Sequence, residues 1–324
     1  MCSYTSTPSS HHGAPLLPSL DIFKPFFIEA PGGVKIRCAT FDADPAARTR
    51  GVCVLLQGQS EFMEKYQEVI DELRGRGFTV ATMDWRGQGG SQRGQSDPLK
   101  SYVKNYDDYA EDFAAFMAKV VTPLTNHPPI VLAHSMGGHN TIRAVHDHPD
   151  WFRCAVTTAP MLKFSTRGYP QSAARAAAAL YNALGKGGDF AWGMAERDPF
   201  KVGFDSQLVT SDRTRFEATQ ALLRKDPDLR LSGPTWGFIE AAYRSLALVN
   251  APGYPESIST PMLIVGAGKD RIVLTEAERS FVKRLPHGEY LEIPEAEHEI
   301  LMEQDSIRAK FWTAFDSFVG KYVP

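Results

Sequence analysis

The chain has 324 residues, of which 43% are hydrophobic and 23% are charged, with 35 Lys and Arg against 38 Asp and Glu. This composition excludes collagen-like, disordered and disulfide-scaffold proteins. At roughly 150 residues per domain, the length predicts about two domains, or one large α/β domain with an insertion. The net charge of −3 lacks the basic excess typical of nucleic-acid binding, so no nucleic-acid partner is expected.

The cysteines and the first twenty residues indicate the compartment. Cys2, Cys38, Cys53 and Cys154 form no C-x-x-C pair, and the last three fall in apolar runs, which predicts reduced thiols in the core. Residues 1–20 are rich in Ser, Pro and His and lack the basic and apolar regions of a secretory signal, so a flexible tail is expected. No apolar run approaches the ~18 residues of a membrane span. These features predict a cytoplasmic protein that is at most peripheral at a membrane.

The chain after the tail begins with a predicted β-hairpin. Two apolar stretches, Phe26–Ala30 and Val34–Phe41, flank the turn sequence Pro31-Gly32-Gly33. Continuous apolar runs then alternate with amphipathic stretches. Predicted strands cover residues 52–56, 78–83, 130–133 and 154–158, and predicted helices cover 61–74, 106–121 and 135–146. Strand and helix at this spacing predict an α/β fold, a mostly parallel sheet with helices on both faces.

The alternation stops between residues 162 and 252. This stretch contains predicted helices at 172–184, 213–225 and 237–249, and no run with the period of a strand. Alternation then resumes, with strands at 262–265 and 290–293 and helices at 276–285 and 307–319. A helical insertion is expected over the carboxyl edge of the sheet, where such folds bind ligands. The predicted organisation is one core of residues 21–162 and 251–324 and a helical cap of residues 163–250.

The most specific motif joins the strand at 130–133 to the helix that follows it. It reads Ala133-His134-Ser135-Met136-Gly137, so a serine lies at the strand-to-helix turn. This context is typical of a nucleophile elbow, in which a strained turn exposes the serine hydroxyl. Ala133 replaces the first Gly of the usual G-x-S-x-G pattern and is small enough to pack there. Ser135 is therefore the candidate nucleophile.

A serine hydroxyl needs a base and an orienting carboxylate before it can attack a substrate. In folds with this elbow the chain order is Ser, then Asp or Glu, then His, each in a loop after a strand. Asp270 follows the strand at 262–265, and His298 follows the strand at 290–293. Taken singly, these two are more simply a turn residue and a helix N-terminal residue. Their order and context together favour a triad of Ser135, Asp270 and His298.

Acyl transfer also needs hydrogen-bond donors for the oxyanion that forms on the substrate. One candidate is the backbone N–H of Met136, directly after the nucleophile. The other is the backbone N–H of Gln59, in the loop after the strand at 52–56.

Other polar residues near these motifs have simpler interpretations. His139 is expected to pack in the core rather than act as a second base. Asp84 and Arg86 are expected to pair with each other, in a glycine-containing loop that does not match a phosphate-binding pattern. Glu297 and Glu299 flank the candidate base and are assigned no role. The chain has neither an H-E-x-x-H pattern nor a Cys/His cluster, so no metal and no cofactor are expected.

Together these motifs resemble the α/β-hydrolase superfamily, and within it the group of monoacylglycerol lipases and bacterial lysophospholipases, which includes sequences labelled serine aminopeptidases. The segments that carry the resemblance are Gln57-Gly58-Gln59-Ser60-Glu61, Lys65-Tyr66, Asp84-Trp85-Arg86-Gly87-Gln88-Gly89, Ala133-His134-Ser135-Met136-Gly137-Gly138, Gly268-Lys269-Asp270 and Glu297-His298. Weaker signs of the lysophospholipase branch are Leu208-Val209-Thr210-Ser211-Asp212 and Ser232-Gly233-Pro234-Thr235. One departure is Gln57, where the family usually has His.

The resemblance implies an α/β-hydrolase fold with an inserted cap, Ser135 as nucleophile, Asp270 as orienter, His298 as base, and Gln59 and Met136 as oxyanion donors. It also implies a serine hydrolase that cleaves lipid carboxylic esters through an acyl-enzyme, as a lysophospholipase or monoacylglycerol lipase. The expected partner is a small-molecule lipid ester, with transient membrane contact through the slightly basic cap. Aromatic residues available for an acyl pocket are Phe164, Tyr169, Trp192, Phe200, Phe204, Trp236 and Phe238.

Two other functions stay open on the sequence. A serine aminopeptidase or amidase would need an acidic cluster in the cap to hold a substrate ammonium, and the available residues are Glu196, Asp198, Asp205 and Asp212. A non-catalytic binding protein of the same fold would be expected to lose members of the triad, and all three are present. The ester hydrolase is therefore the favoured hypothesis.

Overall fold

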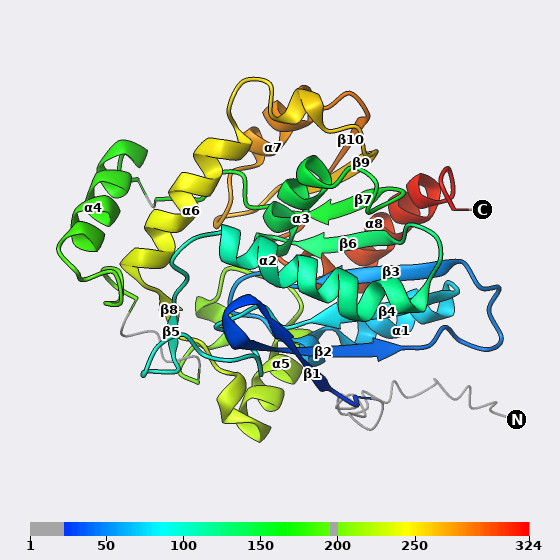
Figure 1. Cartoon of the computed structure of the whole chain (residues 1–324), viewed down its shortest axis with the longest axis horizontal. Coiled ribbons are helices and arrows are strands. Elements are labelled where there is room, and N and C mark those ends of the chain that lie inside the picture. Colours follow the sequence, from blue (N-terminus) through cyan, green and yellow to red (C-terminus); the bar gives the residue numbers. More distant parts are fainter. Residues whose placement is uncertain (1–22, 167, 195–199, 324) are drawn as a thin grey trace, which may run out of the picture.

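The computed structural model describes residues 23–166, 168–194 and 200–323, so the predicted tail at 1–20 lies outside the described residues. At its centre is an eight-stranded sheet (Figure 1) in the order β1-β2-β4-β3-β6-β7-β9-β10. The strands are β1 (Phe26–Ala30), β2 (Val34–Phe41), β3 (Gly51–Leu56), β4 (Phe78–Met83), β6 (Ile130–His134), β7 (Ala155–Thr158), β9 (Met262–Ala267) and β10 (Gly288–Ile293). The pairs β1–β2 and β2–β4 are antiparallel, and all other neighbours are parallel. The predicted mostly parallel α/β sheet is confirmed.

Both faces of this sheet are buried, which explains why its strands are continuous apolar runs. In β3, Val52, Val54 and Leu56 join the core on one face, and Cys53 and Leu55 join the core on the other. The first face is covered by α2 (Asp107–Phe116), α3 (Met136–Asp147) and α7 (Thr275–Val282). The second is covered by α1 (Gln67–Gly75) and α8 (Asp305–Val319). The parallel strands therefore end at one shared edge, between two layers of helices (Figure 1).

Most predicted elements lie where the sequence placed them, and two of the helices are divided. The predicted helix at 61–74 is a 3₁₀ helix, η3 (Met63–Tyr66), followed by α1. The predicted helix at 106–121 is α2 followed by a π-helical stretch, η4 (Met117–Val121). The remaining short helices are η2 (Pro31–Gly33), η5 (Thr122–Leu124), η6 (Phe204–Ser206), η7 (Pro227–Leu229), η8 (Pro255–Ser257) and η9 (Ile300–Met302).

Between the neighbouring strands β7 and β9 the chain leaves the sheet for a long stretch, which we call the intervening segment (residues 163–250). It contains α4 (Gln171–Ala183), α5 (Arg213–Lys225) and α6 (Trp236–Val249), in agreement with the predicted helices. The segment also contains a strand that no periodic run indicated, β8 (Gly233–Pro234), which pairs in parallel with β5 (Lys100–Ser101). A strand of two residues is too short to show a period in sequence.

The three helices of the intervening segment meet the rest of the molecule differently. Phe238 and Ala241 of α6 are buried in the same core as α2 and α3. Leu222 and Leu223 of α5 pack with Phe62, just before η3. The helix α4 packs against α6 and projects at the left of Figure 1.

The loop after β4 corrects one expectation about ion pairs. Asp84 and Arg86 do not pair with each other. The Asp84 carboxylate is fully buried and lies 2.8 Å from Arg37 Nε, whereas Arg86 Nε donates to Asp112 at 2.6 Å. The Asp84 carboxylate also accepts the backbone N–H of Gly90 at 2.8 Å. A buried carboxylate must be hydrogen-bonded, and Asp84 finds its donors on β2, on η3 and in its own loop, while Arg86 pairs with α2.

Cys38, Cys53 and Cys154 are free and buried in the core, as predicted, and Cys2 lies outside the described residues. Among the residues with assigned structure, no helix has the length and apolar character needed to cross a membrane.

Candidate active site

Ser135 lies at the sharp turn between β6 and α3. Its φ of 51° and ψ of −114° fall outside the regions that residues with a side chain normally adopt. Backbone hydrogen bonds hold this turn, because the carbonyl of Ser135 accepts the N–H groups of His139 in α3 and of Met161 after β7, both at 3.0 Å. Such strain persists only where the surrounding structure enforces it, and it is typical of functional sites. The predicted strand–turn–helix context of Ser135 is therefore present.

The start of α3 is pressed against the end of β3, which explains the glycine after the elbow. A Cβ placed on Gly137 would lie 2.5 Å from the carbonyl oxygen of Gln57, closer than real side chains approach backbone. A Cβ placed on Gly138 would lie 3.0 Å from Pro160 on the opposite side. Close packing of backbone against backbone therefore requires very small residues here.

The structure brings His298 and Asp270 to Ser135 from the loops after β10 and β9. His298 Nε2 lies 3.0 Å from Ser135 Oγ, and His298 Nδ1 lies 2.6 Å from Asp270 Oδ2. The other carboxylate oxygen of Asp270 accepts the backbone N–H groups of Ile272 at 2.7 Å and Val273 at 2.9 Å. The carboxylate is thus fixed at both oxygens, and the hydrogen-bond chain runs from Asp270 through His298 to the serine hydroxyl.

Burial and charge act in opposite directions on this pair. Burial by itself would lower the pKa of His298, but the charge and hydrogen bond of Asp270 outweigh it and raise the pKa. Burial would likewise raise the pKa of Asp270, and the charge of His298 together with the hydrogen bonds that Asp270 accepts holds that pKa below its usual value. The pair therefore favours an ionised carboxylate beside a histidine that readily accepts a proton.

The loop after β3 passes directly beside Ser135. A Cβ placed on Gly58 would lie 3.1 Å from Ser135 Cβ, a tight contact, so glycine at residue 58 favours the close approach of the loop to the serine. Ser60 in the same loop has a φ of 65°, in the left-handed region that residues with a side chain rarely adopt. In the described part of the chain, neither the backbone N–H of Gln59 nor that of Met136 donates a hydrogen bond. Both candidate donors are thus free of protein acceptors.

Gln57, the departure from the family pattern, has a fully buried side chain that serves the fold. Its amide Nε2 donates to Thr82 Oγ1 at 2.9 Å, and its backbone carbonyl accepts the indole N–H of Trp85 at 2.9 Å. These contacts tie the loop after β3 to the neighbouring strand β4.

A buried ionic cluster that was not predicted from the sequence lies next to the loop after β3. Lys65 Nζ lies 2.6 Å from a carboxylate oxygen of Glu61 and 2.6 Å from one of Glu299. Glu61 also accepts the backbone N–H of Gly58 at 2.5 Å and the hydroxyl of Tyr66 at 2.7 Å. The cluster therefore links the loop that carries Gln59 to the residue after His298. In the sequence, Glu61 and Lys65 belong to segments that carry the family resemblance, but their i,i+4 spacing is common on solvated helices and did not predict a buried cluster with Glu299.

Burial by itself would lower the pKa of Lys65, but the charges of Glu299 and Glu61 outweigh it and raise the pKa. Burial by itself would raise the pKa of Glu61, and the charge of Lys65 outweighs it and lowers the pKa to about 2. A buried Lys between two carboxylates is held in its charged form by these partners.

Two further buried histidines flank the elbow. The ring of His134 lies 4.7 Å from that of His298 and its Nδ1 contacts the hydroxyl of Thr158 at 3.1 Å. His139 contacts the carbonyl of Met161 at 2.9 Å and the hydroxyl of Ser245 at 2.7 Å. Burial lowers the pKa of His134 to about 4 and that of His139 to about 3, so both are neutral at neutral pH. The prediction that His139 packs in the core is confirmed.

The aromatic residues considered for an acyl pocket are scattered. Tyr169 and Trp192 are exposed, whereas Trp236 and Phe238 are buried. The backbone of Phe164 pairs with that of Val273, in the loop after Asp270. Phe200 and Phe204 line an open surface cavity of about 440 Å³, and none of the three residues of the hydrogen-bond chain lines it. These aromatic residues therefore differ in burial, and two of them, Phe200 and Phe204, line a cavity apart from the hydrogen-bond chain.

The acidic residues considered for an aminopeptidase do not converge where they are described. Asp212 caps α5 and pairs with Arg215 at 2.9 Å. Asp205 is exposed and pairs with Arg213. The other two candidates, Glu196 and Asp198, lie outside the described residues. Across the described ranges, no group of three or more His, Cys, Asp or Glu could hold a metal ion.

Comparison with known proteins shows the family of this chain. The family model "Serine aminopeptidase, S33" matches residues 47–305. Lysophospholipase L2 of Escherichia coli is 29% identical, over 84% of this chain and 81% of the relative, and a monoacylglycerol lipase of Mycolicibacterium smegmatis is 26% identical, over 85% and 89%.

Among solved structures, a soluble variant of monoglyceride lipase from Saccharomyces cerevisiae superposes with a TM-score of 0.74 at 19% identity, covering 99% of this chain and 100% of that one. At 19% sequence identity, this structural similarity supports the fold alone. The resemblance inferred from the sequence motifs is confirmed, because the family model covers well over half of the chain. The chain belongs to the serine aminopeptidase S33 family and has the α/β-hydrolase fold.

Proposed function

We propose that the protein is a serine hydrolase that cleaves carboxylic esters of lipids. The observation that carries the proposal is the hydrogen-bond chain Ser135–His298–Asp270, built on a strained elbow at the carboxyl end of a parallel strand. A hydroxyl held in this way is activated by the neighbouring base, and the carboxylate keeps the base in the right orientation and tautomer.

In the proposed reaction, His298 Nε2 takes the proton of Ser135 as Oγ attacks the ester carbonyl. The tetrahedral intermediate collapses, and the protonated His298 donates that proton to the departing alcohol. Water then attacks the acyl-enzyme while His298 accepts one of its protons, and the fatty acid leaves as Ser135 regains its proton. The ionised Asp270 stabilises the imidazolium in both halves of the reaction.

The oxyanion of each intermediate would be held by the backbone N–H groups of Gln59 and Met136. Both donors lie on segments that pack beside Ser135, and neither is used by another group in the described part of the chain. Donors fixed before the reaction stabilise the developing charge without rearranging. Because both donors are backbone groups, Gln57 in place of the family His leaves them intact.

Relatives support a lipid ester as substrate. The curated proteins that match over most of their length are named lysophospholipase L2 and monoacylglycerol lipase. We propose that the intervening segment (residues 163–250) is the cap predicted from the sequence and that it helps to select the substrate.

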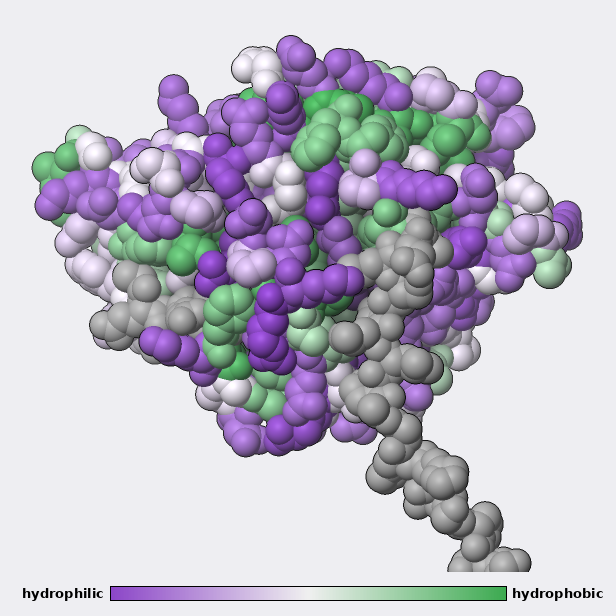
Figure 2. Space-filling view, turned by 90° about the horizontal axis from the view of Figure 1, so that it is seen from below, coloured by the Kyte–Doolittle hydropathy of each residue, from purple (hydrophilic) through white to green (hydrophobic). Residues whose placement is uncertain are grey.

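Membrane contact is proposed through the projecting end of the cap. Tyr169, Leu180, Leu184 and Trp192 are large apolar residues with exposed fractions between 56% and 74%. Figure 2 shows apolar surface at the left end of the visible face, the end at which α4 lies in Figure 1, as well as a larger apolar area along the top of that view. Exposed aromatic and aliphatic residues at one end of a protein suit insertion into a lipid interface.

The proposal is tested with the wild-type protein and the Ser135→Ala variant. Both would be assayed on p-nitrophenyl esters of several chain lengths, a monoacylglycerol, a lysophospholipid and aminoacyl anilides. We expect ester hydrolysis that increases with acyl length and disappears in Ser135→Ala. Ester turnover that survives in the variant contradicts the mechanism. A preference for aminoacyl anilides favours the aminopeptidase instead.

A further inference from the structure

One strip of the intervening segment runs along the loop that carries His298. This strip is Val209–Ser211, part of the motif that the sequence analysis noted without assigning a role. The backbone N–H of Glu299 donates to the carbonyl of Val209 at 2.7 Å, and the hydroxyl of Thr210 donates to the carbonyl of Met302 at 2.7 Å. These contacts begin at the residue directly after His298.

The carboxylate of Glu303 joins the strip to the other side of His298. Glu303 is fully buried, and one of its oxygens accepts the backbone N–H of Glu297, the residue before His298, at 2.7 Å. The other oxygen accepts the backbone N–H of Ser211 at 3.1 Å and also the Ser211 hydroxyl. Among the described residues, no cation contacts this carboxylate. It is satisfied by hydrogen-bond donors, which come from the two segments it joins and, at 3.3 Å, from the backbone N–H of the next residue, Gln304.

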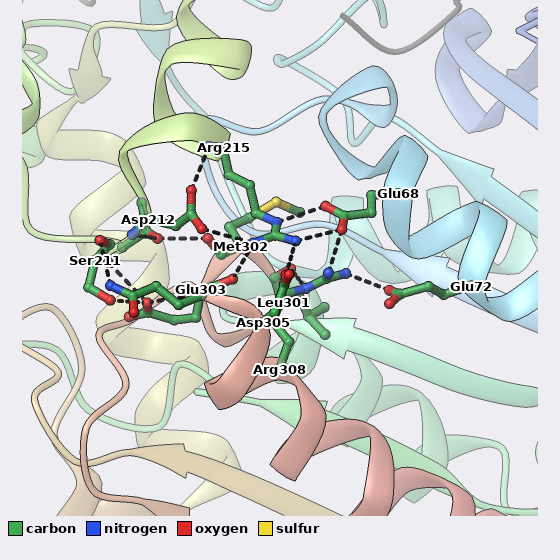
Figure 3. A network of polar contacts seen from close by, with 12 residues as sticks. Glu68, Glu72, Ser211, Asp212, Arg215, Leu301, Met302, Glu303, Asp305 and Arg308 are labelled. Atoms are coloured by element: carbon green, nitrogen blue, oxygen red, sulfur yellow. Dashed lines mark hydrogen bonds and ion pairs between the residues drawn. The ribbon is translucent and has the colours of Figure 1, made fainter. Parts of the chain in front are cut away.

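The strip is itself anchored to the core, as Figure 3 shows. Arg215, in the first turn of α5, donates to the carbonyl of Glu303 at 2.9 Å, to Glu68 of α1 at 2.6 Å and to Asp305 of α8 at 2.6 Å. Arg308 of α8 contacts the same Glu68 carboxylate from the core side (Figure 3). The beginning of α5 is therefore tied to both helices that cover this face of the sheet, so the strip has a rigid support.

We propose that Glu303 and Ser211 are positioning residues for the proposed base, His298. The inference rests on the proposed function, because it assigns to this contact the alignment of His298 with Ser135 and Asp270. Hydrogen bonds on both sides of His298 limit the movement of its loop, and small displacements of a catalytic group cost large factors in rate. The intervening segment would then contribute to the alignment of the base as well as to the choice of substrate.

Three variants test the role of the contact. Glu303→Gln keeps the volume but replaces one acceptor oxygen with an NH₂ group, so either the Glu297 N–H or the Ser211 donors lose their acceptor. Ser211→Ala removes only the hydroxyl, and Ser211→Thr retains it. Ser206→Ala is the matched control, because Ser206 lies exposed in the same segment and, within the described ranges, its hydroxyl bonds to the neighbouring Gly203 alone.

The measurements are kcat and KM on a p-nitrophenyl ester, the pH profile, and amide hydrogen exchange in residues 297–304. We expect Ser211→Ala to lower kcat about tenfold with KM within twofold, since loss of alignment acts on the chemical step. The acidic limb of kcat/KM should move to lower pH, because a looser His298–Asp270 contact raises the His298 pKa less. Amide hydrogen exchange at Glu297 and Glu299 should be faster in Ser211→Ala than in the wild type. Ser211→Thr should recover most of the wild-type rate. Glu303→Gln should show the same defects as Ser211→Ala.

The inference is overturned if Ser211→Ala and Glu303→Gln keep the wild-type kcat, pH profile and exchange, or if Ser206→Ala shows the same defects. Failure of the proposed function gives a different result, in which the wild-type protein shows no turnover that depends on Ser135. In that case hydrogen exchange in residues 297–304 still decides whether Ser211 and Glu303 hold the loop.

Discussion

The sheet core and the intervening segment are built on different contacts. In the core, apolar strands are buried on both faces, and each residue of the hydrogen-bond chain lies in a turn or loop directly after a strand. The intervening segment adds apolar contacts through α5 and α6, but it reaches the loop of His298 through backbone, hydroxyl and carboxylate groups. The core thus brings Ser135, His298 and Asp270 together, and we propose that the intervening segment acts on their alignment and on access to them.

The largest expected effect is on the core side of this comparison. Asp270→Asn should lower kcat by roughly 10⁴-fold, because an amide cannot hold His298 in the tautomer that accepts the serine proton. Initial rates on a p-nitrophenyl ester measure it. Asp205→Asn is the matched control in the intervening segment, where the side chain is exposed, and it should leave kcat unchanged. An Asp270→Asn variant with kcat within tenfold of wild type would contradict the assigned role.

Removal of the buried lysine should destabilise the fold more than any surface ion pair. Lys65→Met leaves the carboxylates of Glu61 and Glu299 buried without their cation, which is expected to cost about 3–5 kcal/mol in the free energy of unfolding. Urea unfolding followed by circular dichroism measures the loss. Lys321→Met is the control, because its pair with Glu289 is about half exposed on both sides and is worth about 0–1 kcal/mol. Equal losses in the two variants would show that burial of the cluster has no special cost.

The pH dependence of kcat/KM tests the role of His298 in the core. His298 must be neutral to accept the serine proton, and its pKa is raised above the ordinary histidine value of about 6.5. A raised pKa keeps the histidine protonated, and therefore inactive, up to a higher pH. The acidic limb of kcat/KM should accordingly lie above pH ~6.5. A limb well below that value would mean that burial outweighs Asp270 in setting the pKa.

The smallest expected effect on stability lies at the projecting end of the intervening segment. Replacement of both Leu180 and Leu184 by Gln should change the free energy of unfolding by no more than about 0.5 kcal/mol, because both side chains are exposed. Binding to phosphatidylcholine–phosphatidylglycerol vesicles in a flotation assay should fall roughly tenfold. Leu248→Gln is the control, an exposed leucine near the end of α6, and it should bind vesicles as the wild type does. Unchanged binding in the α4 variant would remove that helix from the membrane contact.

Several contacts in the structure could not be predicted from the sequence. Asp84 pairs with Arg37 rather than Arg86, and the Lys65 cluster draws its third member from a loop more than two hundred residues away in the chain. The strand β8 is also absent from the sequence pattern, because two residues show no period. In each case the partner is chosen by the arrangement of elements in space, and local spacing carries no information about it.

The sequence by itself determined the α/β order of elements, the elbow at Ser135, and the chain order of Asp270 and His298, because each depends on hydrophobic period or on a turn next to a strand. Only the tertiary structure decided which charges meet in the Lys65 cluster and which residues of the intervening segment contact the loop of His298. Those contacts join segments far apart in the chain. They are required because a buried charge or carboxylate costs free energy unless it is paired or hydrogen-bonded, and the fold decides which groups are near enough to do so.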